Sequence, residues 1–303
     1  MGQKTRSVWI AAALGAAAAG GAIVSAQQPG IALVTPARGF GANVTPAFEG
    51  WFDNPDGSHN FLIGYYNRNT REEFDIPIGP NNKFEPGNPD MGQPTHFLTR
   101  RRYGFFIVTV PKEFTKTQKV TWTLTSNGVT ASIPFQLHTD YNISPFKASE
   151  ESPNREFNRP PTLRFVEGGP SVNGPMATGH KALIERTATA GQPMPLDIFA
   201  DDDALSANAT GATTRDLEPV KVEVTKYRGP GTVTVSELKL TVTKGGKPTE
   251  PFAAKTSPTV VFGVAGDYLL HVDALDYSGK GGASSGGAGC CWTTAIVKVA
   301  VAN

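Results

Sequence analysis

The sequence predicts an all-β chain built as two antiparallel β-sandwich domains in tandem. Three observations predict this class. Short runs that alternate apolar and polar residues recur along the chain, and no stretch has the 3.6-residue period of an amphipathic helix. The 33 glycines and 24 prolines accompany short runs of aromatic and β-branched residues, as in chains of many strands and turns. Residues 147–159 lose the alternation and become polar, which is typical of an interdomain linker.

Residues 1–26 have the pattern of a cleavable signal peptide. Lys4 and Arg6 form a short positive region, Val8–Val24 is apolar and rich in alanine, and Val24-Ser25-Ala26 supplies small residues for cleavage. The alternative is a membrane anchor, but glycines interrupt the apolar region, whereas stable spans usually have about 20 strongly apolar residues. We therefore expect Sec-type export and a secreted mature protein, periplasmic or extracellular, without a membrane span.

The charge of the mature chain excludes two classes of partner. Cleavage removes two basic residues and no acidic one, so the net charge changes from +1 to −1. A chain balanced in this way has no field that would attract nucleic acid or an anionic membrane. Its length is sufficient for two cores of ordinary domain size, and we expect domains at 27–146 and 160–303.

The first domain is expected to contain seven or eight short strands. Asn54–Gly57 has favoured turn residues, and Pro77 marks an edge strand. Residues 79–94, which hold four prolines and three glycines, predict a long irregular loop. Asn127-Gly128 between alternating runs predicts a type I′ hairpin turn, because both residues tolerate positive φ. The expected strands are 31–34, 48–52, 61–66, 74–78, 105–110, 120–126 and 129–133.

The second domain repeats this organisation and ends in a long hairpin. A glycine-rich loop that extends to His180 follows its first strand, and the hairpin covers residues 266–301. The expected strands before the hairpin are 162–166, 191–200, 221–225, 232–235, 238–242 and 259–262.

Two stretches of this domain resemble strands of polycystic-kidney-disease-like and cadherin-like domains. Residues 191–202, GQPMPLDIFADD, resemble their B strand, and residues 266–276, GDYLLHVDALD, resemble their F-strand pattern G-x-Y-x-L-x-V-x-A-x-D. The resemblance covers about 110 residues and implies an immunoglobulin-like sandwich. The first half resembles the N-terminal part of uncharacterised exported bacterial proteins through Glu49-Gly50-Trp51, Asn54–Gly57 and Gly92–Thr95.

The F-strand pattern also predicts which residues face the core. The two-residue period of a strand places Tyr268, Leu270, Val272 and Ala274 on one face, and it turns His271 and its alternate neighbours outward or toward the other domain. Tyr268 lies where a tyrosine corner would bond back to the backbone; the alternative is an ordinary half-buried tyrosine.

The resemblance implies a cluster of carboxylates. In such a sandwich the B and F strands run toward the same end, which would bring Asp201, Asp202 and Asp203 beside Asp276. Calcium requires six to eight hard oxygen ligands, and related cadherin-like domains bind it between modules. This chain lacks their flanking Asp-x-Asn-Asp motif. Two readings stay open: a calcium site, and solvated aspartates in turns.

Cys290 and Cys291 are the only cysteines. Neighbours on a strand point to opposite faces, so both cannot enter one core. Export makes a disulfide reasonable. A vicinal disulfide, an intermolecular disulfide and two thiols are the alternatives, of which we favour the vicinal bond.

Other patterns are weaker. Gly282–Gly286 matches G-x-S-x-G, but a strand rather than a helix follows, so it is no nucleophile elbow. The five histidines lack metal-ligand spacing. Arg100–Arg102 is a solvated edge or an interdomain salt-bridge partner. The aromatic residues of the first half form a core or, alternatively, a sugar-stacking platform; they are Trp51, Phe52, Tyr65, Tyr66, Phe84 and Phe97.

Together these patterns predict an exported, non-enzymatic protein with a binding, adhesion or surface-structural role. Its expected partner is an extracellular glycan or protein. The alternative is a hydrolase, or an accessory subunit of an extracellular hydrolase, with a site built from loops.

Overall fold

The structure of the protein is a computed structural model that describes residues 38–146, 159–202, 220–243, 252–276 and 291–303. These residues form strands and one short 3-10 helix, η1 (Thr139–Tyr141), so the all-β prediction is confirmed. Ala37–Asn303 forms one compact unit. The signal segment and the strand expected at 31–34 lie outside the described residues, and the proposed domain and linker boundaries stay predictions.

The first half, residues 38–146, consists of two three-stranded antiparallel sheets with a two-stranded ribbon beside them. The first sheet has the order β1-β2-β6, the second β4-β7-β8, and the ribbon pairs β3 with β5. Their bounds are β1 (Val44–Asp53), β2 (His59–Asn67), β3 (Phe74–Asp75), β4 (Asn82–Glu85), β5 (His96–Phe97), β6 (Arg100–Val110), β7 (Val120–Ser126) and β8 (Val129–Phe135).

Alternation along these strands explains the core between the two sheets. On β7, Val120, Trp122 and Leu124 are buried, and the threonines between them are half-buried on the other face. Trp122 meets Phe106 of the facing sheet edge-to-face, with ring centroids 5.2 Å apart. Strand β2 is central in its sheet and buried on both faces, as its continuous apolar run predicts.

The hairpin between β7 and β8 has the predicted turn. Asn127 and Gly128 have φ values of 47° and 74°, which are the positive values that a type I′ turn requires at both central positions.

The second half, residues 159–303, contains a five-stranded sheet, a four-stranded sheet and a three-stranded sheet. Their strand orders are β10-β9-β13-β17-β16, β11-β20-β19-β14 and β12-β18-β15. Among the described strands of this half, pairing is antiparallel except between β11 and β20, which are parallel. The bounds are β9 (Thr162–Arg164), β10 (Ser171–Val172), β11 (Ile184–Thr189), β12 (Met194–Pro195), β13 (Ile198–Asp201), β14 (Val220–Arg228), β15 (Val233–Val235), β16 (Thr241–Thr243), β17 (Ala253–Thr256), β18 (Thr259–Phe262), β19 (Gly266–Asp276) and β20 (Trp292–Ala302).

The predicted core face of β19 is confirmed. Tyr268, Leu270, Val272 and Ala274 have no exposed surface and belong to the apolar cluster of the second half. The Tyr268 hydroxyl donates a hydrogen bond to the carbonyl oxygen of Val264 at 2.8 Å, so the tyrosine-corner alternative holds.

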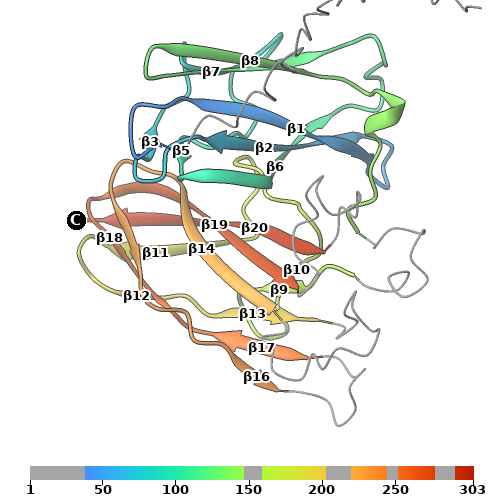
Figure 1. Ribbon diagram of the computed structural model, residues 1–303. Coiled ribbons are helices and arrows are strands. Elements are labelled where there is room, and N and C mark those ends of the chain that lie inside the picture. The colour runs from blue at the N-terminus through green and yellow to red at the C-terminus, as the bar shows by residue number, and fades with distance from the viewer. Residues whose placement is uncertain (1–37, 147–158, 203–219, 244–251, 277–290) are drawn as a thin grey trace, which may run out of the picture. The chain divides into compact units, whose positions relative to one another are not determined.

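The opposite face of β19 and β20 packs against the first half. Leu269 and Ile296 contribute to the core of the first half, and His271 contacts the Phe105 carbonyl through Nε2 at 2.7 Å. Trp292 lies so close to Gly104 that a Cβ there would be 2.4 Å from its ring, which leaves room only for glycine. Figure 1 shows the resulting succession of layers, from β7 and β8 through β1, β2 and β6 to β19 and β20, and then β13, β17 and β16.

Several elements depart from the sequence-based expectations. Strands β5, β10 and β17 were not predicted, and the strand expected at 191–200 is divided into β12 and β13. Strand β4 lies within the predicted loop 79–94, because Asn82–Glu85 pairs with β7. Strand β11, which was not predicted, pairs in parallel with β20 along the whole of its length. The edge strand expected at 74–78 is only two residues long, since Pro77 cannot donate to a ladder.

Candidate ligand-binding site between the two halves

A pocket of about 490 Å³ lies where the first half meets the second. We call it the junction pocket. The first half lines it with Asn54–Asp56, Ser58, Asn60, Ile107 and Thr109; the second half does so with Ser171, Val172, Met176, Thr178, Lys181, Leu183 and Thr294–Ile296. Its volume falls within the ~300–1,000 Å³ typical of small-molecule sites.

One wall of the junction pocket carries a continuous chain of hydrogen bonds, which we call the relay. Thr109 Oγ1 donates to Asn60 Oδ1 at 2.7 Å, and Asn60 Nδ2 donates to Asn54 Oδ1 at 2.8 Å. Asn54 Nδ2 donates to Ser58 Oγ at 2.9 Å, and Ser58 Oγ donates to Asp56 Oδ1 at 2.6 Å. Every donor points the same way along the relay, so each bond polarises the next toward the carboxylate.

The local sequence explains the relay. The backbone N–H of Gly57 donates to the Asn54 carbonyl at 3.0 Å, which closes the predicted turn. Within that turn, hydrogen bonds from the side chain and backbone of Ser58 lower the pKa of Asp56. Asn60 and Thr109 are directly paired residues of β2 and β6, so their side chains meet on one face of the sheet.

The floor of the junction pocket is apolar. Ile107 is buried on β6, Ile296 is buried on β20, and half-buried Met176 and Leu183 come from the intervening segment of the second half. Backbone hydrogen bonds fix this floor: the N–H of Ile107 donates to the Ala177 carbonyl, and the N–H of Leu183 donates to the Ile296 carbonyl, both at 2.8 Å.

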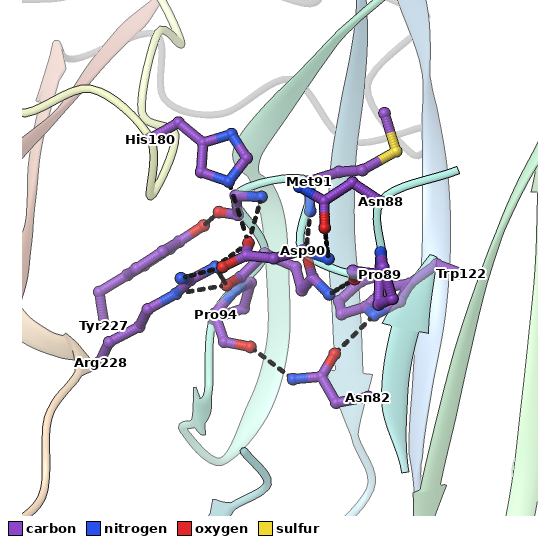
Figure 2. Close-up of polar contacts among 12 residues, drawn as sticks. Asn82, Asn88, Pro89, Asp90, Met91, Pro94, Trp122, His180, Tyr227 and Arg228 are labelled. Atoms are coloured by element: carbon purple, nitrogen blue, oxygen red, sulfur yellow. Dashed lines mark hydrogen bonds and ion pairs between the residues drawn. The ribbon is translucent and has the colours of Figure 1, made fainter. Parts of the chain in front are cut away.

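The segment that carries Met176, Thr178 and Lys181 also contacts a second group of residues, which lies outside the junction pocket. Figure 2 shows Asp90 between Arg228 and His180. Arg228 donates to both Asp90 oxygens at 2.9 and 2.8 Å, and His180 Nε2 lies 3.1 Å from Asp90 Oδ1. The N–H of Gly92 donates to Asp90 at 2.9 Å. We call Asp90, Gly92, His180 and Arg228 the Asp90 cluster.

The electrostatics of the Asp90 cluster keep its carboxylate charged. Burial raises the pKa of Asp90. The hydrogen bonds from Arg228 and Gly92 and the charges of Arg228 and His180 have the larger effect and lower the pKa to about 2. Gly92 continues the link: its carbonyl accepts hydrogen bonds from the Tyr227 hydroxyl and from the N–H of Gly179.

The loop that contains Asp90 is fixed to the first half as well. Asn82 accepts a hydrogen bond from the Trp122 indole at 2.9 Å and donates to the Pro94 carbonyl at 2.8 Å (Figure 2). It also donates to the Ile76 carbonyl at 2.9 Å. Asn82 is fully buried, and these bonds satisfy both ends of its amide. The Asp90 cluster therefore connects a fixed loop of the first half to one wall of the junction pocket.

The acidic residues predicted from the sequence lie elsewhere. Asp201, at the end of β13, pairs with Arg164 of β9. Asp201 and Asp202 line a second pocket, of about 900 Å³, together with Asp53 and Phe146. Asp276 ends β19, where its N–H donates to the Cys291 carbonyl at 3.2 Å.

Within the described ranges, no three His, Cys, Asp or Glu side chains are grouped so as to hold a metal ion. Asp203 lies outside those ranges, and calcium binding stays a prediction. Cys291 is buried immediately before β20, whereas Cys290 and Gly282–Gly286 are outside the described residues, so the vicinal disulfide also stays a prediction.

Two other interpretations are decided. Trp51, Phe52, Tyr65, Phe84 and Phe97 are buried in the apolar clusters, so the sugar-stacking alternative is wrong for these side chains. In the arginine run, Arg102 forms an ion pair with Glu223 of β14 at 2.9 Å, which confirms a salt bridge between the two halves.

Most of the junction pocket carried no recognisable sequence signal. The turn at Asn54–Gly57 was predicted, but nothing local indicated that Thr109, Met176 and Lys181 would lie around it. Their proximity depends on the pairing of β2 with β6 and on the packing of the two halves.

No protein-family model matches the chain, and no curated protein sequence matches it. Among solved structures, the crystal structure of domains 4 and 5 of the S-layer protein SbsC aligns at 12% sequence identity, covering 86% of this chain and 98% of that chain. The TM-score is 0.21, which is too low to support an argument. None of the helices in the described part of the chain has the length and apolarity needed to cross a membrane.

Proposed function

We propose that the protein is an exported, non-enzymatic binding protein whose ligand occupies the junction pocket. The observation that carries this proposal is the pocket itself, in which an apolar floor faces a hydrogen-bonding wall. Sites for small molecules combine these two features, since apolar surface supplies binding free energy and a few fixed polar groups orient the ligand. The ligand would be an extracellular molecule or the exposed end of a glycan or protein.

The fold and the export signal support a role outside the cytoplasm. We propose that the two halves are immunoglobulin-like sandwiches in tandem, as the resemblance of residues 191–202 and 266–276 to polycystic-kidney-disease-like and cadherin-like domains implies. The tyrosine corner at Tyr268 supports this assignment for the second half. The cleavage pattern at Val24-Ser25-Ala26 supports secretion into the periplasm or the medium.

The pocket assignment is tested by closing the junction pocket with a large side chain. Ser171 is exposed at the pocket rim, so Ser171→Trp should fill the pocket without disturbing a core. Thermal unfolding of the secreted mature chain is measured with a panel of sugars, amino acids and short peptides at millimolar concentration. We expect at least one compound to raise Tm, because a ligand that binds only the folded state stabilises it. The increase should disappear in Ser171→Trp.

Ser132→Trp is the matched control, since Ser132 is exposed on β8 and does not line the junction pocket. An equal increase in Tm in Ser171→Trp and the wild type would place the ligand elsewhere. The bound compound should be recovered chemically unchanged after prolonged incubation. Its conversion to a product would replace the proposal by the hydrolase alternative.

A further inference from the structure

We infer that the junction pocket takes a neutral, polyhydroxylated ligand: a mono- or disaccharide. This inference rests on the proposed function, because it specifies the ligand class of the same pocket. Its basis is the direction of the hydrogen bonds in the relay, together with the balance of charge and the size of the pocket.

The relay determines which hydrogen-bonding groups face the ligand. Asn60 is fully buried, so it orients its neighbours rather than touching a ligand. Thr109 is exposed and uses its hydroxyl hydrogen on Asn60, so it presents acceptor lone pairs to the pocket. Half-buried Asn54 uses one amide hydrogen on Ser58 and retains a second as a donor. Asp56 accepts at Oδ1 and retains Oδ2 as an acceptor.

The wall therefore presents to the pocket, in order, an acceptor on Thr109, a donor on Asn54 and an acceptor on Asp56. A sugar hydroxyl both donates and accepts, and adjacent hydroxyls on a ring can satisfy such an alternating set. Ser171 and Thr178 add hydroxyl groups from the second half. The half-buried apolar side chains of the lining, Val172, Met176 and Leu183, suit the C–H face of the same ring.

The charge of the pocket favours a neutral ligand over a zwitterion. Its charged lining residues are Asp56 and Lys181, which are of opposite sign and exposed. Exposed ion pairs contribute little net free energy, so these two charges do not select strongly for a charged ligand. The lining has more neutral hydrogen-bonding groups than charged ones, which suits a neutral ligand.

The volume sets the size of the ligand. The junction pocket, of about 490 Å³, falls within the ~300–1,000 Å³ typical of small-molecule sites and has room for a mono- or disaccharide.

The test is isothermal titration calorimetry of the secreted mature chain with defined probes. The sugar arm contains mono- and disaccharides of glucose, galactose, mannose and N-acetylglucosamine. The zwitterion arm contains leucine and the dipeptide glycyl-leucine. We expect a saccharide to bind and neither zwitterion to compete with it. Thr109→Val, which removes the acceptor hydroxyl but keeps the shape of the side chain, should weaken binding of that saccharide about fivefold to tenfold.

Thr123→Val is the matched control, because Thr123 also makes a hydroxyl hydrogen bond across strands, to Ser132, but lies outside the junction pocket. Its affinity should equal that of the wild type. If a zwitterion binds and no saccharide does, the ligand class is wrong while the proposed function stands. Absence of binding by every saccharide in the panel also overturns the inference. Saccharide binding that is unchanged in Ser171→Trp overturns both proposals.

Discussion

At the residue scale, Asp90 joins segments that are far apart in the sequence. Its carboxylate accepts hydrogen bonds from Gly92 in its own loop and from Arg228 at the end of β14, and it contacts His180 beside the junction pocket. A charged hydrogen bond of this kind is stronger than a neutral one, and removal of one partner leaves the other uncompensated. Loss of the Asp90 side chain should therefore destabilise both halves.

The lowered pKa of Asp90 predicts a defined dependence of stability on pH. Its pKa falls from the ordinary 3.8 to about 2 in the folded state, so the ionised form stabilises the fold. This contribution is present above about pH 4 and is lost as the pH falls toward 2. After allowance for solvent screening, we expect Asp90→Asn to lower the free energy of unfolding by about 1–2 kcal/mol at pH 7.

Urea unfolding of both proteins between pH 7 and pH 2 measures this contribution. The difference between wild type and Asp90→Asn should shrink as the pH falls below 4. Asp267→Asn, at an exposed position on β19, is the control and should behave as the wild type at every pH. A difference that stays constant down to pH 2 would contradict the assigned role of the Asp90 carboxylate.

At the element scale, β19 has two buried faces that belong to different cores. Leu270 and its alternate neighbours face the core of the second half, whereas Leu269 packs against the core of the first half. The two-residue period of a strand explains the division, since adjacent side chains point in opposite directions. Strand β19 therefore fixes the position of both halves relative to the neighbouring strand β20, which carries part of the floor of the junction pocket.

The tyrosine corner at the beginning of β19 should contribute measurably to stability. Tyr268→Phe removes the hydroxyl that bonds to the Val264 carbonyl and keeps the ring in the core. We expect the free energy of unfolding to fall by about 1 kcal/mol, the usual value for one such bond. Chemical denaturation of Tyr268→Phe and of Tyr141→Phe, a control at a tyrosine that is 52% exposed, tests this. Equal stabilities of the two variants would show that the corner bond is energetically neutral.

The strands and turns also show which parts of the fold can be predicted from sequence patterns. The alternation in β7 and β19 and the Asn127-Gly128 turn were predicted, because each depends on neighbours in the sequence. Strand β4 was missed because proline and glycine surround it, and its stability comes from pairing with β7 about forty residues later. Strand β11 was missed for a similar reason, since its partner β20 lies more than a hundred residues away.

At the scale of the whole molecule, the two halves share an interface that includes apolar packing, the Arg102–Glu223 ion pair and the Asp90 cluster. The junction pocket exists only because this interface places the Asn54–Gly57 turn beside the segment around Met176. A sequence pattern cannot predict such a site, since its walls meet through long-range packing. Only the turn, which is one part of the wall, was predictable.

The shared interface predicts that the two halves unfold together. Calorimetry should show a single transition, with equal calorimetric and van't Hoff enthalpies. Leu124→Ala in the core of the first half and Leu270→Ala in the core of the second should each lower the Tm of that same transition, since such changes cost about 2–5 kcal/mol. Two separate transitions, each sensitive to only one substitution, would show that the halves are independent.

The central claim is that a sugar binds in the junction pocket, and a crystal structure of the mature chain with the best-binding saccharide tests it most directly. We predict density for a sugar ring on Met176 and Leu183, with its hydroxyls hydrogen-bonded to Thr109 and Asn54. A saccharide bound elsewhere on the protein, with the junction pocket holding only water, would contradict the claim.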